Sequence, residues 1–600
     1  MNLGSSDGSL PADHFAQVRL EVQQNWRVYL LSAGVAFGAM INGWDIGLIG
    51  GVLVTPSFQT AFGLLSDKAS ASYRLAQLKG NIVSILQAGC FVGAAGGLYL
   101  PARIGHRRTL IISALIFVVG SIVQTSCLVG YAPGKELAKS AGLPQLYLGR
   151  LIGGCGVGLS SAVGPSYITE ISPAKIRGRV TGCWQFFGLT GIMLAFFVNY
   201  GVSKAGYGPL DTRSWRLPFA LQLIPGAIFL IAVLMSPESP RWLFERRNDE
   251  GGARQSLASL YGCGTHDGPV EEVMAEIRRD VALSSMNNAL FLRKQNPSVV
   301  PDNHDRDARS PVLSATLAPS QQTKGLAATN APLNWRVILS HPVTMYRLSI
   351  AAFLFMFQQL TGTNSLNYYS PTIFRALGVR DDLLATGLYG IIKVVTSMLA
   401  NIFAAEQLGR KWSLILSGVG QSLCLVWIGI FLRFRPPTAD QTSHNTEHAT
   451  QLDAVALVTV IVLFCYVGFY SLGWAGGPWV AGNELAPTHT QLRSIAMALG
   501  NMNSWIFNAI IAKVTPLMLE SIKYGTFLVF ASTMLSGVLW VIFFMPEPAG
   551  WPLEQTDVLF EGGHLVQRSL ADLSPRKRAA FKQEKLAQAS ATEASVIKGI

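Results

Sequence analysis

Apolar runs of about 20 residues recur along the chain and are separated by short polar segments. A helix rises about 1.5 Å per residue, so a run of this length can cross the hydrocarbon core of a bilayer. The pattern predicts twelve membrane-spanning helices in two sets of six. The first set is expected at 26–54, 81–100, 109–130, 146–168, 180–202 and 215–236. The second set is expected at 344–375, 383–405, 412–432, 453–482, 494–519 and 523–545.

These spans divide the chain into two halves and three polar regions. We expect an all-α membrane protein with an N-terminal six-helix half, 27–236, and a C-terminal six-helix half, 344–545. A linker at 237–343 joins them, and polar tails cover 1–26 and 546–600. The first tail has no signal-peptide pattern, so we expect the first apolar run to be an uncleaved span.

The linker has two parts that differ in composition. Charged and apolar residues from Glu271 to Leu292 have the spacing of an amphipathic helix. Residues 296–330 are rich in Pro, Ser, Asp, Thr and Ala, which predicts disorder.

Short motifs relate the two halves, and each recurs about 300 residues further along the chain. Arg103-Ile-Gly-His-Arg recurs as Gln407-Leu-Gly-Arg-Lys, Tyr167-Ile-Thr-Glu as Ala481-Gly-Asn-Glu, and Pro237-Glu-Ser-Pro as Pro546-Glu-Pro-Ala. Nearly equal offsets indicate duplication of a six-span unit. Six spans return the chain to its starting side, so the repeats are expected to be parallel and related by an axis along the membrane normal.

Composition supports a membrane protein and charge gives its orientation. The chain is 50% hydrophobic and 14% charged, which is too apolar for disorder and too poor in charge for an ordinary soluble protein. A net charge of +12 is compatible with nucleic-acid binding, but we attribute it to cytoplasmic loops rich in Lys and Arg. Basic residues crowd the connections near Arg107, Arg177 and Arg410, so both termini are predicted to be cytoplasmic.

Several classes of protein are disfavoured by what the sequence lacks. Six of the seven cysteines lie in apolar runs without CxxC or metal-ligand spacing, so we predict no disulfide and no metal site. The sequence has no phosphate-binding loop and no nucleophile elbow, so an enzyme is not expected. It also lacks rings of charge and a carbonyl-filter motif, so a channel is disfavoured.

The most informative stretch is polar and lies inside the seventh span. Within the apolar run from Leu348 to Phe374, the segment Gln358 to Pro371 reads QQLTGTNSLNYYSP. Amides and hydroxyls at membrane depth are costly unless they face protein or a watery cavity. Single residues of this kind can serve as contacts between helices. The whole cluster instead predicts a site for a neutral polyol, because amides both donate to and accept from hydroxyls.

Asp45 and Lys393 are ionisable residues inside predicted spans. Asp45 is the one carboxylate of the first span, and Lys393 lies deep in the eighth. An ionisable residue at membrane depth is a candidate for function. We predict that Lys393 either favours a substrate that carries a carboxylate or forms a structural pair with an intramembrane acid or helix-end carbonyls.

The motifs resemble those of the sugar porter family of the major facilitator superfamily, over 27–245 and 335–555. They are Gly149-Arg150, Pro165-Ser-Tyr-Ile-Thr-Glu170, Pro237-Glu-Ser-Pro-Arg241, Gln358-Gln-Leu-Thr-Gly-Thr-Asn364 and Gly476-Gly-Pro-Trp479. Within that family, Asn367-Tyr-Tyr-Ser-Pro and Gly390-Ile-Ile-Lys393 are most similar to fungal quinate permeases.

The resemblance implies a set of substrate-binding residues. Together with the polar stretch they are Gln185, Gln358, Gln359, Asn364, Asn367, Lys393, Trp479, Asn503 and Ser504. Trp479 offers a flat face to a sugar ring and an N–H donor. Ile192 stands where many relatives have a second glutamine in the fifth span, which removes one amide from the expected site.

The resemblance also implies a coupling pair and a cytoplasmic gate. Asp45, paired with Arg150, is expected to take up and release a coupling proton, and no other cofactor is expected. Gate residues are predicted to be Arg107, Glu170, Arg177, Arg410, Glu484 and Arg493, with Glu170 pairing with Arg107 and Glu484 with Arg410. His106 stands where the family usually has an arginine, so this gate is expected to be weaker.

These features predict a secondary active transporter for a sugar, polyol or sugar acid, working by proton symport and alternating access. A facilitative uniporter and a non-transporting nutrient sensor of the same fold are the alternatives. We expect a monomer in the plasma membrane, with a small-molecule substrate, the lipid bilayer as its surroundings and no nucleic-acid partner.

Overall fold

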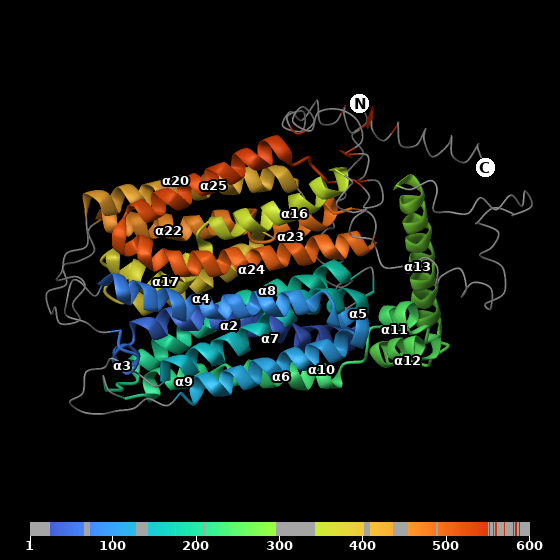
Figure 1. Cartoon of the computed structure of the whole chain (residues 1–600), viewed down its shortest axis with the longest axis horizontal. Helices are drawn as coiled ribbons and strands as arrows, with labels where there is room; N and C mark the ends of the chain where they lie inside the picture. The colour runs from blue at the N-terminus through green and yellow to red at the C-terminus, as the bar shows by residue number, and fades with distance from the viewer. Residues whose placement is uncertain are drawn as a thin grey trace, which may run out of the picture.

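The computed structural model describes residues 25–64, 72–127, 142–173, 176–208, 211–295, 342–400, 408–435, 454–487 and 490–549, with isolated positions of the C-terminal tail. The regular structure of these residues is helical, and twelve helical segments are long and apolar enough to cross a membrane. The predicted number of spans is confirmed. Figure 1 shows the helices as two bundles side by side, the N-terminal half in blue and green and the C-terminal half in yellow to red.

Close helix packing builds the N-terminal half. Its helices are α2 (Trp26–Val54), α3 (Pro56–Ala61), α4 (Ser72–Gly97), α5 (Leu100–Ile104), α6 (His106–Thr125), α7 (Gly142–Ile171), α8 (Arg177–Lys204), α9 (Arg213–Leu221) and α10 (Leu223–Met235). The α4 helix begins earlier than the predicted 81–100. Glycines bring α4 against α7, because a Cβ at Gly93 would lie only 2.1 Å from the carbonyl oxygen of Cys155. Small residues allow this approach of backbones in membrane helices.

Two spans of the C-terminal half are broken into helix pairs. Its helices are α16 (Pro342–Leu360), α17 (Thr363–Ala376), α18 (Asp382–Leu399), α20 (Arg410–Phe434), α22 (Ala454–Leu472), α23 (Gly477–Leu485), α24 (Thr490–Ser521) and α25 (Gly525–Phe544). Gly362 separates α16 from α17 in the left-handed region, with φ 83°. Broken helices free backbone groups at membrane depth, which is tolerated only where protein or a cavity surrounds them.

The linker forms helices at one end of the molecule, which we call the linker end (Figure 1). They are α11 (Pro240–Arg247), α12 (Glu250–Tyr261) and α13 (Gly268–Gln295). The predicted helix from Glu271 to Leu292 is confirmed within α13, whereas the predicted disordered stretch lies outside the described residues. Arg254 holds α12 to α13 by bonding Glu271 at 2.5 Å, and this hydrogen bond lowers the pKa of the Glu271 carboxyl.

Residues of the C-terminal tail that the structure describes pack against the C-terminal half at the linker end. The buried Arg347 of α16 donates to the carbonyl of Ala486 at 2.6 Å and to the hydroxyl of Thr556 at 3.0 Å. The ring of Phe560 lies 4.6 Å from the Arg347 guanidinium. Leu559 is buried in the same apolar cluster as Leu414 and Trp474. Arg347 therefore ties α16, the end of α23 and the tail together.

The two halves contact each other most closely toward the opposite end, which we call the far end and where α2, α8 and α24 finish. The α4 helix packs on α24, and a Cβ at Gly80 would lie 2.6 Å from the carbonyl oxygen of Lys513. At the surface, Lys204 pairs with Asp381 at 2.9 Å. The Ser72 hydroxyl donates to Glu520 at 2.6 Å. These contacts join residues of different halves and hold the far end closed.

Candidate functional site

A chain of hydrogen-bonded polar side chains runs through the C-terminal half. Lys393 Nζ donates to Asn367 Oδ1 at 3.0 Å, and Asn367 Nδ2 donates to Asn364 Oδ1 at 3.2 Å. Asn364 Nδ2 donates to Gln359 Oε1 at 2.7 Å, and Gln359 Nε2 donates to the Ser504 hydroxyl at 2.7 Å. The structure thus brings five predicted binding residues into one continuous line.

The break at Gly362 is what assembles this line. Gln359 lies in the last turn of α16, while Asn364 and Asn367 follow in the first turns of α17. Lys393 comes from the buried face of α18, and Ser504 comes from α24. Four helices therefore contribute to one polar line, which an unbroken seventh span would not place in this way.

Two other predicted amides are engaged by backbone carbonyls. Gln358 Nε2 donates to Trp474 O at 2.8 Å and to Ala475 O at 3.2 Å, where α22 ends. Asn503 Nδ2 donates to Ala352 O at 2.6 Å. The amides of Gln358 and Asn503 thus donate to backbone oxygens of neighbouring segments. In this arrangement the two amides stabilise the packing of the helices.

Gln185 and Trp479 lie on elements that border the line. Gln185 is half-buried in α8 of the N-terminal half, and within the described chain its amide makes no hydrogen bond. Trp479 is half-buried in α23 and packs edge-on against Phe355, with ring centroids 4.7 Å apart. Both side chains keep surface available for other contacts.

Asp45 and Arg150 form a buried ion pair in the N-terminal half. Arg150 Nη1 lies 3.4 Å from Asp45 Oδ1, and the two side chains are 1% and 0% exposed. Among the described residues, Asp45 Oδ2 and Arg150 Nε have no hydrogen-bond partner. The predicted pair is therefore present, with a single long contact and unused polar atoms on both sides. A buried ion pair offsets the cost of its desolvation only with good geometry and further hydrogen bonds, and within the described part of the chain this pair has neither.

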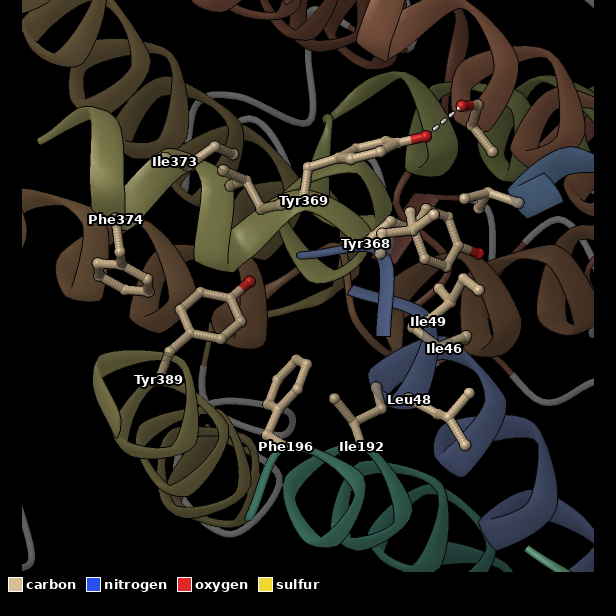
Figure 2. Packing of buried hydrophobic residues seen from close by; sticks show 14 of the residues in the cluster. Ile46, Leu48, Ile49, Ile192, Phe196, Tyr368, Tyr369, Ile373, Phe374 and Tyr389 are labelled. Atoms are coloured by element: carbon tan, nitrogen blue, oxygen red, sulfur yellow. Dashed lines mark hydrogen bonds between the residues drawn. The ribbon is translucent and has the colours of Figure 1, made fainter. Parts of the chain in front are cut away.

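A second polar cluster, which the sequence reasoning missed, joins the halves. Gln87 Nε2 of α4 donates to the Tyr368 hydroxyl at 2.7 Å, and this hydroxyl donates to Asn508 Oδ1 of α24 at 3.1 Å. All three side chains are buried. Figure 2 shows Tyr368 and Tyr369 leaving α17 in different directions and Tyr389 of α18 pointing toward α17. The sequence feature that could have predicted this cluster is an amide inside an apolar span, such as Gln87.

The polar residues at the linker end differ partly from expectation. Arg410 pairs with Glu484 at 3.2 Å, as predicted. The predicted pair of Arg107 with Glu170 is wrong for this structure. Glu170 instead accepts from the Ser239 hydroxyl at 2.5 Å and lies 3.4 Å from His106 Nδ1.

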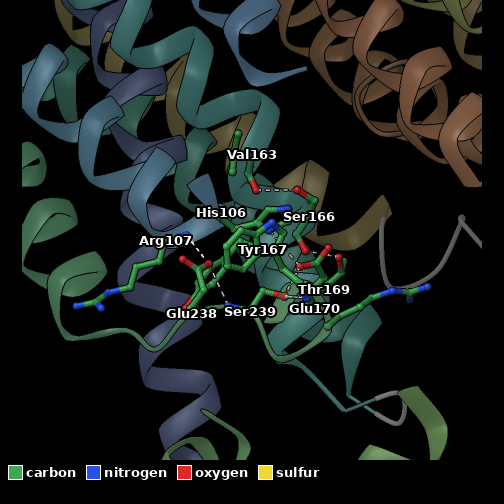
Figure 3. Close-up of polar contacts among 12 residues, drawn as sticks. His106, Arg107, Val163, Ser166, Tyr167, Thr169, Glu170, Glu238 and Ser239 are labelled. Atoms are coloured by element: carbon green, nitrogen blue, oxygen red, sulfur yellow. Dashed lines mark hydrogen bonds and ion pairs between the residues drawn. The ribbon is translucent and has the colours of Figure 1, made fainter. Parts of the chain in front are cut away.

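Arg107 points away from Glu170, as Figure 3 shows. Its guanidinium donates to the carbonyl of Leu234 at 2.7 Å, and its backbone N–H donates to Glu238 at 2.9 Å. A cation at a helix C-terminus satisfies carbonyls that have no partner in the helix, which accounts for the choice. Arg493 lies half-buried on α24, and the Arg177 side chain lies outside the described residues.

The sequence profile described as "Sugar (and other) transporter" matches residues 31–301 and 305–560. The chain is 32% identical over 544 residues to the quinate permease of Emericella nidulans, covering 90% of this chain and 89% of that protein. It is 31% identical over 540 residues to a probable quinate permease of Aspergillus fumigatus, covering 90% and 88%.

The fold is similar to that of a solved bacterial transporter. The xylose transporter XylE from E. coli, in a partially occluded inward open conformation, matches with a TM-score of 0.63 and 24% identity. This match covers 87% of the present chain and 100% of the other. At this identity the likeness shows that the chain shares the fold of XylE.

Proposed function

Because the chain belongs to the sugar (and other) transporter family of the major facilitator superfamily, we propose that it imports a sugar-like or quinate-like polyol by proton symport. The observation that best supports this proposal is the hydrogen-bonded line from Lys393 to Ser504, in which three amide side chains lie between the ammonium group and the hydroxyl. Each amide both donates and accepts, so the line is suited to several hydroxyl groups of one small ring.

The proposed mechanism is alternating access of the two halves. Polar contacts at the far end, including Lys204 with Asp381, would open when one half rocks on the other. With the termini in the cytoplasm and the protein in the plasma membrane, opening of the far end would admit solute from outside. We propose that a monomer is sufficient, because each chain contains both halves and the whole polar line.

The buried pair is proposed as the coupling site. Asp45 would release its proton when Arg150 is close and take one up when access changes. XylE, which is similar to this chain in fold, is described as a proton:xylose symporter, and this supports the proposal of proton coupling. No cofactor other than the coupling proton is proposed.

Uptake of radiolabelled quinate and glucose into transporter-deficient cells tests the function. We expect saturable uptake of at least one solute, with alkalinisation of the medium. Asp45→Asn should abolish uphill accumulation but leave exchange of labelled for unlabelled solute, because binding and rocking do not need a titrating group. Unchanged accumulation in this variant would remove the coupling role. Binding of a solute without any transport would favour a sensor.

A further inference from the structure

Two donors on α18 converge on one acceptor. Lys393 Nζ lies 3.0 Å from Asn367 Oδ1, and the Tyr389 hydroxyl lies 3.2 Å from the same oxygen. Tyr389 and Lys393 are four residues apart, so they share one face of the helix. Their donors are therefore already arranged around one oxygen position, which the Asn367 amide oxygen fills.

Among the residues that the structure describes, Lys393 has no carboxylate as its partner. The residue is only 3% exposed. The Tyr470 ring lies 5.5 Å from Nζ, a distance at which a ring face attracts a cation. A ring and an amide oxygen carry only partial charges, whereas a buried cation is stabilised best by a full counter-charge with hydrogen bonds.

We propose that Lys393 and Tyr389 form a carboxylate-binding subsite, and that the Asn367 amide oxygen occupies it when no ligand is bound. The ligand class is a polyhydroxylated carboxylate such as quinate or a sugar acid. This inference rests on the proposed function and narrows its substrate to an acid.

The exchange of acceptors is chemically balanced. A carboxylate oxygen accepts the hydrogen bonds of Lys393 and Tyr389, and charge-assisted bonds of this kind are stronger than those to a neutral amide. Asn367 Oδ1 is then free to accept from a hydroxyl of the same ligand. The next groups along the line, Asn364 and Gln359, can bind further hydroxyls. The acid group is thereby placed at α18 and the hydroxyls toward α24.

Removal of the two donors tests the subsite. Radiolabelled quinate, galacturonate and glucose are compared in Lys393→Met, Tyr389→Phe and wild type, normalised to surface expression. We expect Lys393→Met to weaken both acids about tenfold to a hundredfold, and to weaken any glucose uptake by a smaller factor. Tyr389→Phe should weaken the acids about threefold to tenfold. Lys523→Met removes an exposed lysine at the far end and serves as the charge control.

Asn367→Asp gives a sharper test, because it supplies Lys393 with a counter-charge inside the protein. This variant should lose acid uptake by at least about tenfold, and a cooperative unfolding transition of the purified protein shows that it has folded. Equal loss of acids and glucose in Lys393→Met would overturn the subsite, as would undiminished acid uptake in Asn367→Asp.

Failure of the subsite and failure of the transport proposal give different results. Wild type that carries glucose but neither acid overturns the subsite and leaves transport intact. Wild type that carries no solute overturns the transport proposal. In that case thermal stabilisation of the purified protein by quinate, and its loss in Lys393→Met, decides the subsite. Absence of stabilisation in wild type overturns it.

Discussion

At the scale of single residues, the same side-chain types play two roles that only their partners distinguish. Gln359 and Gln358 are neighbours in sequence, yet Gln359 bonds the Ser504 hydroxyl and Gln358 bonds the backbone carbonyls of Trp474 and Ala475. Adjacent helix residues project about 100° apart, so neighbours reach different elements. An amide at membrane depth therefore indicates a polar environment. Whether the amide belongs to a binding site or to the helix packing depends on which groups it bonds.

The balance of charge in the Asp45–Arg150 pair gives a prediction at this scale. Removing one partner of a buried pair leaves an uncompensated charge, which typically costs about 3–5 kcal/mol. Arg150→Met should therefore lower the unfolding temperature of the detergent-solubilised protein more than Asp45→Asn combined with Arg150→Met does. The double variant is neutral at this site and serves as the control. Equal unfolding temperatures of the single and the double variant would contradict the burial of the pair seen in the structure.

At the scale of elements, the broken seventh span depends on one glycine. Gly362 has φ 83°, and a Cβ there would lie 2.9 Å from Cγ of Phe530. A side chain in the left-handed region costs about 1–2 kcal/mol, and the contact with the ring adds to this cost. Because Gly362 sets the angle between α16 and α17, its conformation also sets the spacing of Gln359 from Asn364.

Gly362→Ala should consequently lower both stability and transport. The unfolding temperature and the half-saturation constant for the transported solute are the measurements. Gly201→Ala is the matched control, since Gly201 lies in α8 with open space around its Cα and no positive φ. An Ala in a helix is more favourable than Gly, so this control should be neutral or stabilising. Wild-type behaviour of Gly362→Ala would contradict the role assigned to the break.

At the scale of the whole molecule, transport requires two packed halves that can separate at either end. In this structure the far end is held by backbone approach between α4 and α24 and by polar contacts across the halves. Packed interfaces have discrete arrangements, so a side chain inserted between two backbones favours the arrangement in which they part. The linker helices lie at the other end (Figure 1).

Gly80→Val should therefore shift the halves toward opening at the far end, because its Cβ would collide with the Lys513 carbonyl. Spin labels at Ser72→Cys and Glu520→Cys, in a background without other reactive cysteines, report the distance between α4 and α24. We expect a longer distance with Gly80→Val than with Gly80 retained. An unchanged distance distribution would show that this approach does not control the far end.

The sequence by itself determined the class of fold, the number of spans and which ionisable residues lie at membrane depth. These properties follow from local composition, because the bilayer imposes a length of apolar chain and makes each buried charge conspicuous. It also indicated the seventh span as the candidate site, since many polar residues gather there within one apolar run.

Only the tertiary structure decided which polar groups meet. Lys393 reaches Asn367 across two helices, Tyr368 reaches Gln87 across the two halves, and Glu170 meets His106 in place of Arg107. These partners are 26, 281 and 64 positions apart, so no local pattern relates them. A side chain takes the nearest partner that satisfies its hydrogen bonds, and helix packing and the angle at Gly362 determine which partner is near.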